Sequence, residues 1–192
     1  MSDGRRILTS PWLFAASIAV FALFMAFVLP GQATKAAEGA PEGASFDTSL
    51  FYTPVQAFDR AAAHTPEARF AYIAARWSFD LAFPLVYGLF ALAGCAFGIA
   101  RLGPWLSARP RLALVALLGP AFDFAENNAA TVIMASVPVR PLGWGIAASI
   151  ATPVKWLFVV VGIGGAVALP IAAGIRALVI RAAARPRARA RP

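Results

Sequence analysis

Four predominantly apolar stretches determine what this chain can fold into. Residues 12–29, 77–100, 112–137 and 145–175 are each long enough to cross the hydrocarbon core of a bilayer as a helix, which takes about 20 residues. Of the 192 residues, 60% are hydrophobic and 14% are charged, against about 25% charged in soluble domains. The sequence therefore predicts an all-α protein, a polytopic membrane four-helix bundle, and argues against a soluble enzyme.

The basic residues alternate between the two sides of these predicted spans. Eleven arginines lie on one side, in segments 1–11, 101–111 and 176–192, whereas the other side has only Lys35, Arg60, Arg69, Arg76 and Arg140. The positive-inside rule then places both termini in the cytoplasm of a bacterial inner membrane, N-in and C-in. Segment 30–76 and the turn 138–144 lie outside the cytoplasm in this topology.

The net charge of +8 is concentrated in the C-terminal tail rather than on a globular face, so nucleic acid is not an expected partner. Polybasic segments next to a membrane attract anionic lipid. We therefore interpret residues 176–192 as a topology determinant and a contact for anionic lipid. Pro186 and Pro192 predict that no long helix forms after Arg181.

The long extracytoplasmic loop, residues 30–76, has two helix-start signals. Thr53-Pro54 and Thr65-Pro66 each combine an N-cap residue with a proline at the first helical position, and Gln56 completes a capping box. These signals predict two short amphipathic helices, near residues 54–63 and 66–75. Two arrangements remain open, namely anchoring at the membrane interface and folding over the mouth of the bundle as a lid.

The first apolar stretch has an alternative interpretation as a cleaved secretory signal. Arg5 and Arg6 precede it, and the small residues of Gly31-Gln32-Ala33 follow it. Its 18 apolar residues exceed the roughly 7–15 of a signal sequence, so we expect a retained helix.

Cysteine and histidine each occur once, as Cys95 and His64, so an intramolecular disulfide is excluded. A chain with one potential ligand of each kind is not expected to hold zinc or haem, and the sequence predicts no metal and no cofactor.

The third apolar stretch contains the strongest functional signal. Asp123, Glu126 and Asn127 are spaced i, i+3, i+4 and so project from one helical face. The midpoint of residues 112–137 falls near Phe124, which places these groups close to the bilayer centre. Charged groups there cost roughly 2.5–3.5 kcal/mol each on insertion scales and rarely face lipid. We therefore predict that they face the interior of the bundle.

Polar residues of two other stretches are expected nearby. Asp80 begins the second span and Lys155 enters the fourth from the outer side, so the sequence predicts an ion pair between them at similar depth. Glu126 is the predicted proton donor or acceptor, Asp123 its electrostatic partner and Asn127 the amide that orients a ligand. Further predicted ligand-binding residues are Asp80, Tyr87, Lys155 and Trp156. In the alternative interpretation these groups only join helices by hydrogen bonds.

Several of these residues carry a resemblance to known families. The chain resembles a group of uncharacterised bacterial four-helix membrane proteins through Phe51-Tyr52-Thr53-Pro54, Arg69, Tyr72, Asp80, Pro84, Tyr87, Asp123, Glu126-Asn127 and Lys155. Asp80, Pro84 and Tyr87 are also similar to the layout of the EXPERA superfamily, which contains sterol isomerases and the sigma-2 receptor. That resemblance implies a sterol-like or cationic amphiphilic ligand held by intramembrane acids. Residues 12–29 contain no acid and no histidine accompanies Asp80 or Glu126, so isomerase activity is not implied.

Together these observations predict a small integral membrane protein that binds a lipid-like or amphiphilic molecule in an acidic intramembrane cavity. Acid–base chemistry of the isomerase kind is compatible with such a site, and whether the protein is an enzyme stays open. One alternative is a non-catalytic membrane subunit or assembly factor with a protein partner. Another is a homo-oligomeric, proton-coupled carrier.

Overall fold

The computed structural model describes residues 3–31, 46 and 49–189, and all regular secondary structure in these ranges is helical. The all-α prediction is therefore confirmed for the described residues. The elements are α1 (Asp3–Leu8), α2 (Pro11–Leu23), the π-helix η1 (Phe24–Val28), α4 (Pro54–Ala63), α5 (Pro66–Arg76), α6 (Phe79–Ile99), α7 (Pro104–Ser107), the 3₁₀ helix η2 (Pro110–Leu117), α8 (Leu118–Ser136) and α9 (Leu142–Arg189).

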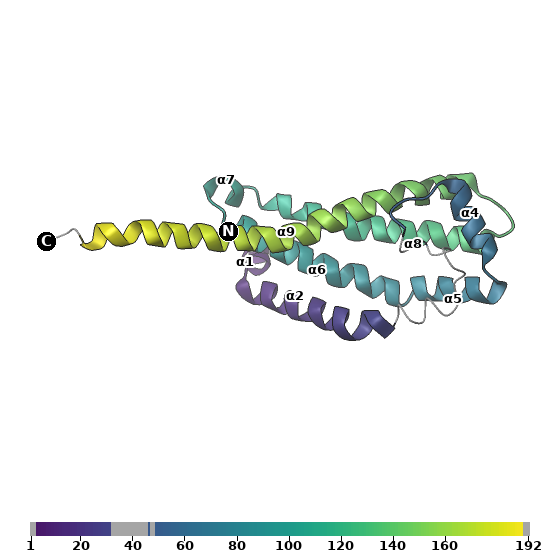
Figure 1. The fold of residues 1–192 in the computed structure, drawn as a ribbon, viewed down its shortest axis with the longest axis horizontal. Coiled ribbons are helices and arrows are strands. Elements are labelled where there is room, and N and C mark those ends of the chain that lie inside the picture. The colour runs from purple at the N-terminus through teal and green to yellow at the C-terminus, as the bar shows by residue number, and fades with distance from the viewer. Residues whose placement is uncertain (1–2, 32–45, 47–48, 190–192) are drawn as a thin grey trace.

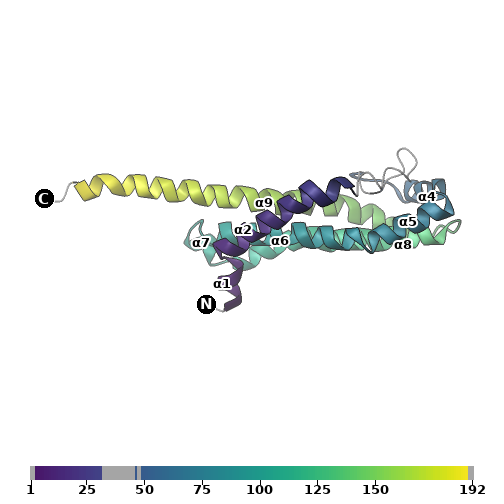
Figure 2. The ribbon, with the colours of Figure 1, turned by 90° about the horizontal axis from the view of Figure 1, so that it is seen from below.

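Helices α6, α8 and α9 pack side by side and form the centre of the molecule (Figure 1). Glycine allows α6 and α9 to approach closely, because a Cβ atom on Gly94 would lie 2.8 Å from the backbone of Ala166. Helix α2 packs on α6 through stacked phenylalanine rings, such as Phe21 on Phe90 with centroids 4.8 Å apart (Figure 2). Asp123 and Glu126 of α8 and Lys155 of α9 lie between these packed helices.

Three helical segments of the described chain are long and apolar enough to cross a membrane: Pro11–Gly31, Pro66–Ile99 and Leu142–Ala184. These segments support the assignment of the chain as a membrane protein. The predicted third span, residues 112–137, is not among them. Its first part forms the 3₁₀ helix η2, and α8 carries two acids and two asparagines that lower its hydropathy.

Helix α9 extends further than the sequence predicted. It has 48 residues, which is roughly 72 Å at about 1.5 Å per residue and more than twice the hydrocarbon thickness. The prediction that no long helix follows Arg181 is wrong, because α9 continues through Pro186 to Arg189. Alanine and arginine have high helix propensity and fill most of these last turns. The tail projects beyond the other helices (Figure 1).

Residues 49–76, which we call the cap, cover one end of α8 and α9. The Thr53 hydroxyl accepts a hydrogen bond from Gln56 and the Gln56 side chain accepts one from Thr53, so the capping box is present. Buried apolar residues join the cap to α8 and α9, namely Tyr52, Ala57, Phe58 and Ala61 against Ala129, Ile133, Met134 and Ala148. These contacts favour the lid arrangement over separate interfacial helices.

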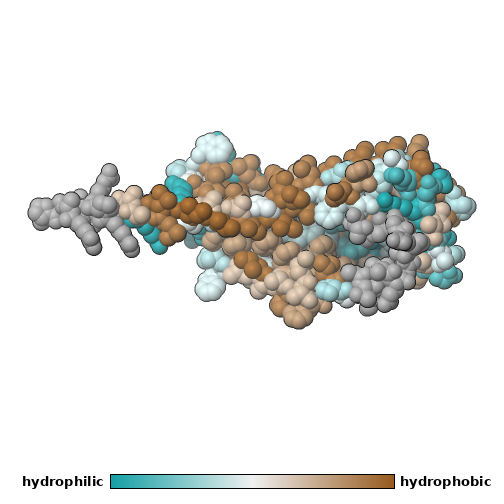
Figure 3. All heavy atoms as spheres, in the orientation of Figure 1, coloured by the Kyte–Doolittle hydropathy of each residue, from teal (hydrophilic) through white to brown (hydrophobic). Residues whose placement is uncertain are grey.

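The surface changes character along the long axis (Figure 3). Apolar residues cover α2 and α9, where Trp12, Val160 and Leu178 are each more than 60% exposed. Hydrophilic residues gather at the end that α4 and α5 occupy. We call this the cap end, and the opposite end, where α9 leaves the other helices, the tail end.

Candidate functional site

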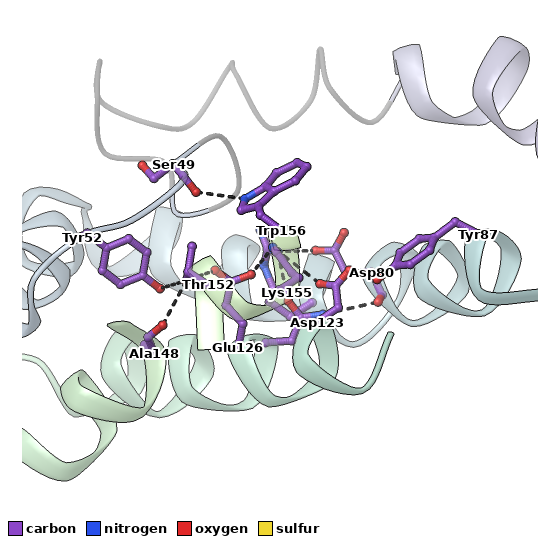
Figure 4. A network of polar contacts seen from close by, with 12 residues as sticks. Ser49, Tyr52, Asp80, Tyr87, Asp123, Glu126, Ala148, Thr152, Lys155 and Trp156 are labelled. Carbon is purple, nitrogen blue, oxygen red and sulfur yellow. Dashed lines mark hydrogen bonds and ion pairs between the residues drawn. The ribbon is translucent and has the colours of Figure 1, made fainter. Parts of the chain in front are cut away.

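A buried ion cluster joins α8 to α9 at the cap end (Figure 4). The Lys155 ammonium donates to Glu126 Oε2 and lies 3.8 Å from Asp123 Oδ1. Lys155 is 6% exposed and Glu126 is 1% exposed. The two acids that the sequence placed on one face of a helix therefore share one ammonium. This arrangement reduces the repulsion expected between them.

Hydroxyl groups complete the surroundings of both carboxylates. The Thr152 hydroxyl donates to Glu126 Oε1, and Tyr52 Oη lies 2.9 Å from Thr152 Oγ1. Because Thr152 has a single hydroxyl proton, Tyr52 is the donor in the second bond when Thr152 donates to Glu126. On the other side, Tyr87 donates to Asp123 Oδ2 at 3.0 Å. A chain of hydroxyl, carboxylate and ammonium groups thus runs from the cap to α6.

A second group of polar contacts links α5 and α6 to α8. Arg76 Nη1 lies 2.8 Å from Asp80 Oδ2 and donates to Asn127 Oδ1 at 3.3 Å. Asn127 in turn donates to the Asp80 carbonyl at 3.4 Å. The sequence predicted Lys155 as the partner of Asp80. Arg76, one helical turn before Asp80, is a partner of Asp80, and both α8 carboxylates are partners of Lys155. The pair between Asp80 and Lys155 stays a prediction.

Trp156 and Tyr52 hold the cap over the ion cluster. The Trp156 indole donates to the Ser49 carbonyl at 3.1 Å, and the Lys155 nitrogen lies 5.3 Å from the centre of its ring. Figure 4 shows Ser49, Tyr52 and Trp156 grouped around the cluster. All seven residues that the sequence predicted for the site therefore lie in one region.

The cluster lies at one end of an apolar band rather than at its centre. Residues 81–100, which belong to α6 and its C-cap, contain no charged residue between Asp80 and Arg101. Residues 156–175 of α9, between Lys155 and Arg176, contain none either. Each 20-residue run is roughly 30 Å long, which equals one hydrocarbon thickness. At the tail end Arg176 donates to the Arg101 carbonyl at 3.4 Å, so the two runs end at the same level along the bundle. We call them together the apolar band.

The depth of Asp123 and Glu126 in the membrane stays a prediction, but the two acids do not lie midway along the apolar band. The sequence placed them at the bilayer centre because they fall in the middle of residues 112–137. In the structure, Asn127 contacts Asp80 in the first turn of α6, and the second half of α8 continues past that point to pack against α4 and α5. The η2 segment also rises about 2.0 Å per residue, so fewer residues cover the band there.

The ion cluster is closely packed. Side-chain exposure is 2% for Glu126, 13% for Asp123 and 17% for Asp80, so access is greatest from the Asp80 side. Two cavities stand out in the described part of the chain, of about 470 and 120 Å³. Both lie away from the cluster, one beside Arg176 and the other beside Arg140. Among the described residues no group of three histidine, cysteine or acidic side chains is placed to hold a metal ion.

Sequence reasoning missed four residues of the site: Ser49, Tyr52, Arg76 and Thr152. Spacing could have identified two of them. Thr152 lies three residues before Lys155 on the same helical face, and Arg76 lies four residues before Asp80. No local pattern reveals Ser49 or Tyr52, because only the folded cap brings them to the cluster.

No protein-family model matches the chain, and comparisons with curated proteins and with solved structures also find no match. The resemblance to the EXPERA superfamily therefore stays a prediction.

Proposed function

We propose that this protein binds an amphiphilic molecule whose polar head reaches the Asp123–Glu126–Lys155 cluster while its tail lies along the apolar band. The supporting observation is the position of the cluster, at the junction between a roughly 30 Å apolar band and a polar cap. An amphiphile in a bilayer has its head at this kind of boundary. The cluster offers that head both carboxylate acceptors and an ammonium donor.

A contribution to the stability of the fold is a poor explanation for the presence of the ion cluster. Replacing a buried ion pair by well-packed apolar residues is often neutral or stabilising, because desolvation offsets the Coulomb attraction. Ionisable residues within membrane-spanning bundles are rare and tend to mark functional sites. Three acids and two bases in contact at this boundary are therefore better explained by a ligand than by packing.

Graded burial suggests an order of contact. Asp80 and Asp123 keep some exposure, whereas Glu126 lies behind Lys155 and Thr152. A hydroxyl or amine head would meet Asp80 and Asp123 before Glu126. Lys155 contacts both α8 carboxylates, so proton exchange between them and a bound head is chemically available, and Glu126 is the group that we assign to it.

The test compares three amphiphiles that share one chain and differ in head group: dodecylamine, dodecanol and dodecanoate. Full-length protein in nanodiscs is incubated with each, and retained ligand is counted by native mass spectrometry. We expect the amine to be retained best and dodecanoate least. The triple variant Asp123→Asn, Glu126→Gln and Lys155→Met removes all three charges of the cluster together and should lose this preference.

The matched control removes a solvent-exposed ion pair from the same protein. Asp59 and Arg140 lie 2.8 Å apart and are each more than half exposed, so Asp59→Asn with Arg140→Met should retain all three amphiphiles as the native protein does. Native-like selection by the folded Asp123/Glu126/Lys155 triple variant would refute the proposal. A co-purifying membrane protein with no retained amphiphile would favour the alternative of an assembly subunit.

A further inference from the structure

A groove of about 470 Å³ lies at the tail end, far from the ion cluster, where α9 leaves the other helices (Figure 1). Its apolar walls come from α6 and α9 and include Phe97, Pro170, Ala173 and Ile180. Three arginines, Arg101, Arg176 and Arg181, line the same groove. An apolar groove lined by guanidinium groups has the chemistry of a binding site for a negatively charged amphiphile.

Two of these arginines, Arg101 and Arg176, are held in place by hydrogen bonds to backbone carbonyls. Arg101 donates to the carbonyls of Thr9 and Phe97 at 3.1 and 3.0 Å, and its guanidinium lies 3.6 Å from the Phe97 ring centre. Arg176 donates to the Arg101 carbonyl. Within the part of the chain that the structure describes, none of the three arginines has a carboxylate in ion-pairing distance. Partial burial lowers the pKa of Arg101 from its ordinary value, as expected for a guanidinium partly withdrawn from water.

Gly103 allows the connection after α6 to pass close to this group. Its φ of +126° is a conformation that favours glycine, and a Cβ atom there would lie 3.4 Å from the Arg176 guanidinium. The backbone at Gly103 therefore lies close to the Arg176 guanidinium.

The groove also has the right depth for a lipid. Arg101 and Arg176 are the charged residues that end the apolar band, so the apolar walls are continuous with the region where acyl chains lie. Gly174 opens one wall, since a Cβ atom on it would have no neighbour within 4 Å. Basic pockets between membrane helices are known to bind the heads of anionic lipids.

We propose that the groove binds one anionic phospholipid, with its phosphate at Arg101, Arg176 and Arg181 and an acyl chain along Phe97 and Gly174. This site is independent of the proposed function, because it lies at the opposite end of the apolar band. It is also distinct from diffuse attraction by the basic tail, since it needs a particular shape as well as positive charge.

The experiment uses the full chain in detergent, stripped of lipid and titrated with dioleoyl phosphatidylglycerol, dioleoyl phosphatidylcholine or inorganic phosphate, with bound lipid counted by native mass spectrometry. We expect preferential retention of phosphatidylglycerol. Arg101→Gln and Arg176→Gln should each weaken it about fivefold, as expected for one basic residue near an anionic head. Arg111→Gln removes the same charge from an exposed position outside the groove and should leave retention unchanged.

A second pair of variants tests shape without changing charge. Gly174→Leu fills the groove and should reduce retention, whereas Gly164→Leu enters equally open space outside it and should not. An equal loss in Arg111→Gln, or unchanged retention in Gly174→Leu, would overturn the proposal in favour of diffuse attraction. Displacement of the lipid by inorganic phosphate, lost in Arg176→Gln, would overturn it in favour of a free anion.

Discussion

Asn127 in α8 donates its side-chain amide to the backbone carbonyl of Asp80 in the first turn of α6. This contact shows how far α8 is offset along α6. It places the acids of α8 at the end of the apolar band, where α6 emerges from it, rather than in the middle. The chemistry expected of the acids changes accordingly, since a site at this level can meet a lipid head group.

The depth of the site predicts a labelling pattern. In a Cys95→Ala background, Asn128→Cys should react with a membrane-impermeant maleimide in nanodiscs, because its exposed side chain lies beside Asn127 at the end of the band. Leu89→Cys is 40% exposed but lies within the band, so it should remain unlabelled. Val55→Cys in the cap is the positive control. If Asn128→Cys were as unreactive as Leu89→Cys, the acids would lie near the bilayer centre.

Breaking the buried Lys155 ion pairs should lower the free energy of unfolding much more than breaking the exposed Arg140–Asp59 pair. Lys155→Met leaves Glu126 and Asp123 buried without their ammonium and should lower the free energy of unfolding by about 3–5 kcal/mol. Arg140→Met breaks the exposed pair with Asp59 and should cost about 0–1 kcal/mol. Unfolding by sodium dodecyl sulfate in mixed micelles measures both. Equal losses would show that the Lys155 pair is solvated rather than buried.

Two glycines should respond in opposite directions to alanine. Gly94→Ala forces a Cβ atom against the Ala166 backbone, so α6 and α9 must separate, at a cost of about 1–3 kcal/mol. Gly164→Ala meets open space and should stabilise α9 by up to about 1 kcal/mol through helix propensity. Thermal unfolding in detergent gives both values. A neutral Gly94→Ala would contradict the close approach of the two helices.

Orientation in the membrane stays a prediction of the arginine distribution, and it can be tested in intact cells. Val55→Cys in the cap should react with an impermeant maleimide without permeabilisation. Trp105→Cys, which is exposed between α6 and η2, should react only after permeabilisation. The reverse pattern would place the cap in the cytoplasm.

Local signals predicted several elements well. The two Thr-Pro pairs indicated α4 and α5, and both threonines accept the expected capping hydrogen bonds. The spacing of Asp123, Glu126 and Asn127 placed them together, because helical periodicity needs no tertiary information. The end of α9 was mispredicted at Pro186, since a single proline near a helix end does not outweigh its alanine and arginine neighbours.

The sequence by itself determined that this chain is helical, that its long segments suit a membrane, and that acids and a lysine are available near one another. Only the tertiary structure decided which base contacts which acid and how far along the apolar band these groups lie. Partner choice depends on the offset between helices, and that offset comes from the packing of α4 and α5 on the end of α8. Hydropathy reports how apolar each segment is and carries no information about how far one helix slides past another.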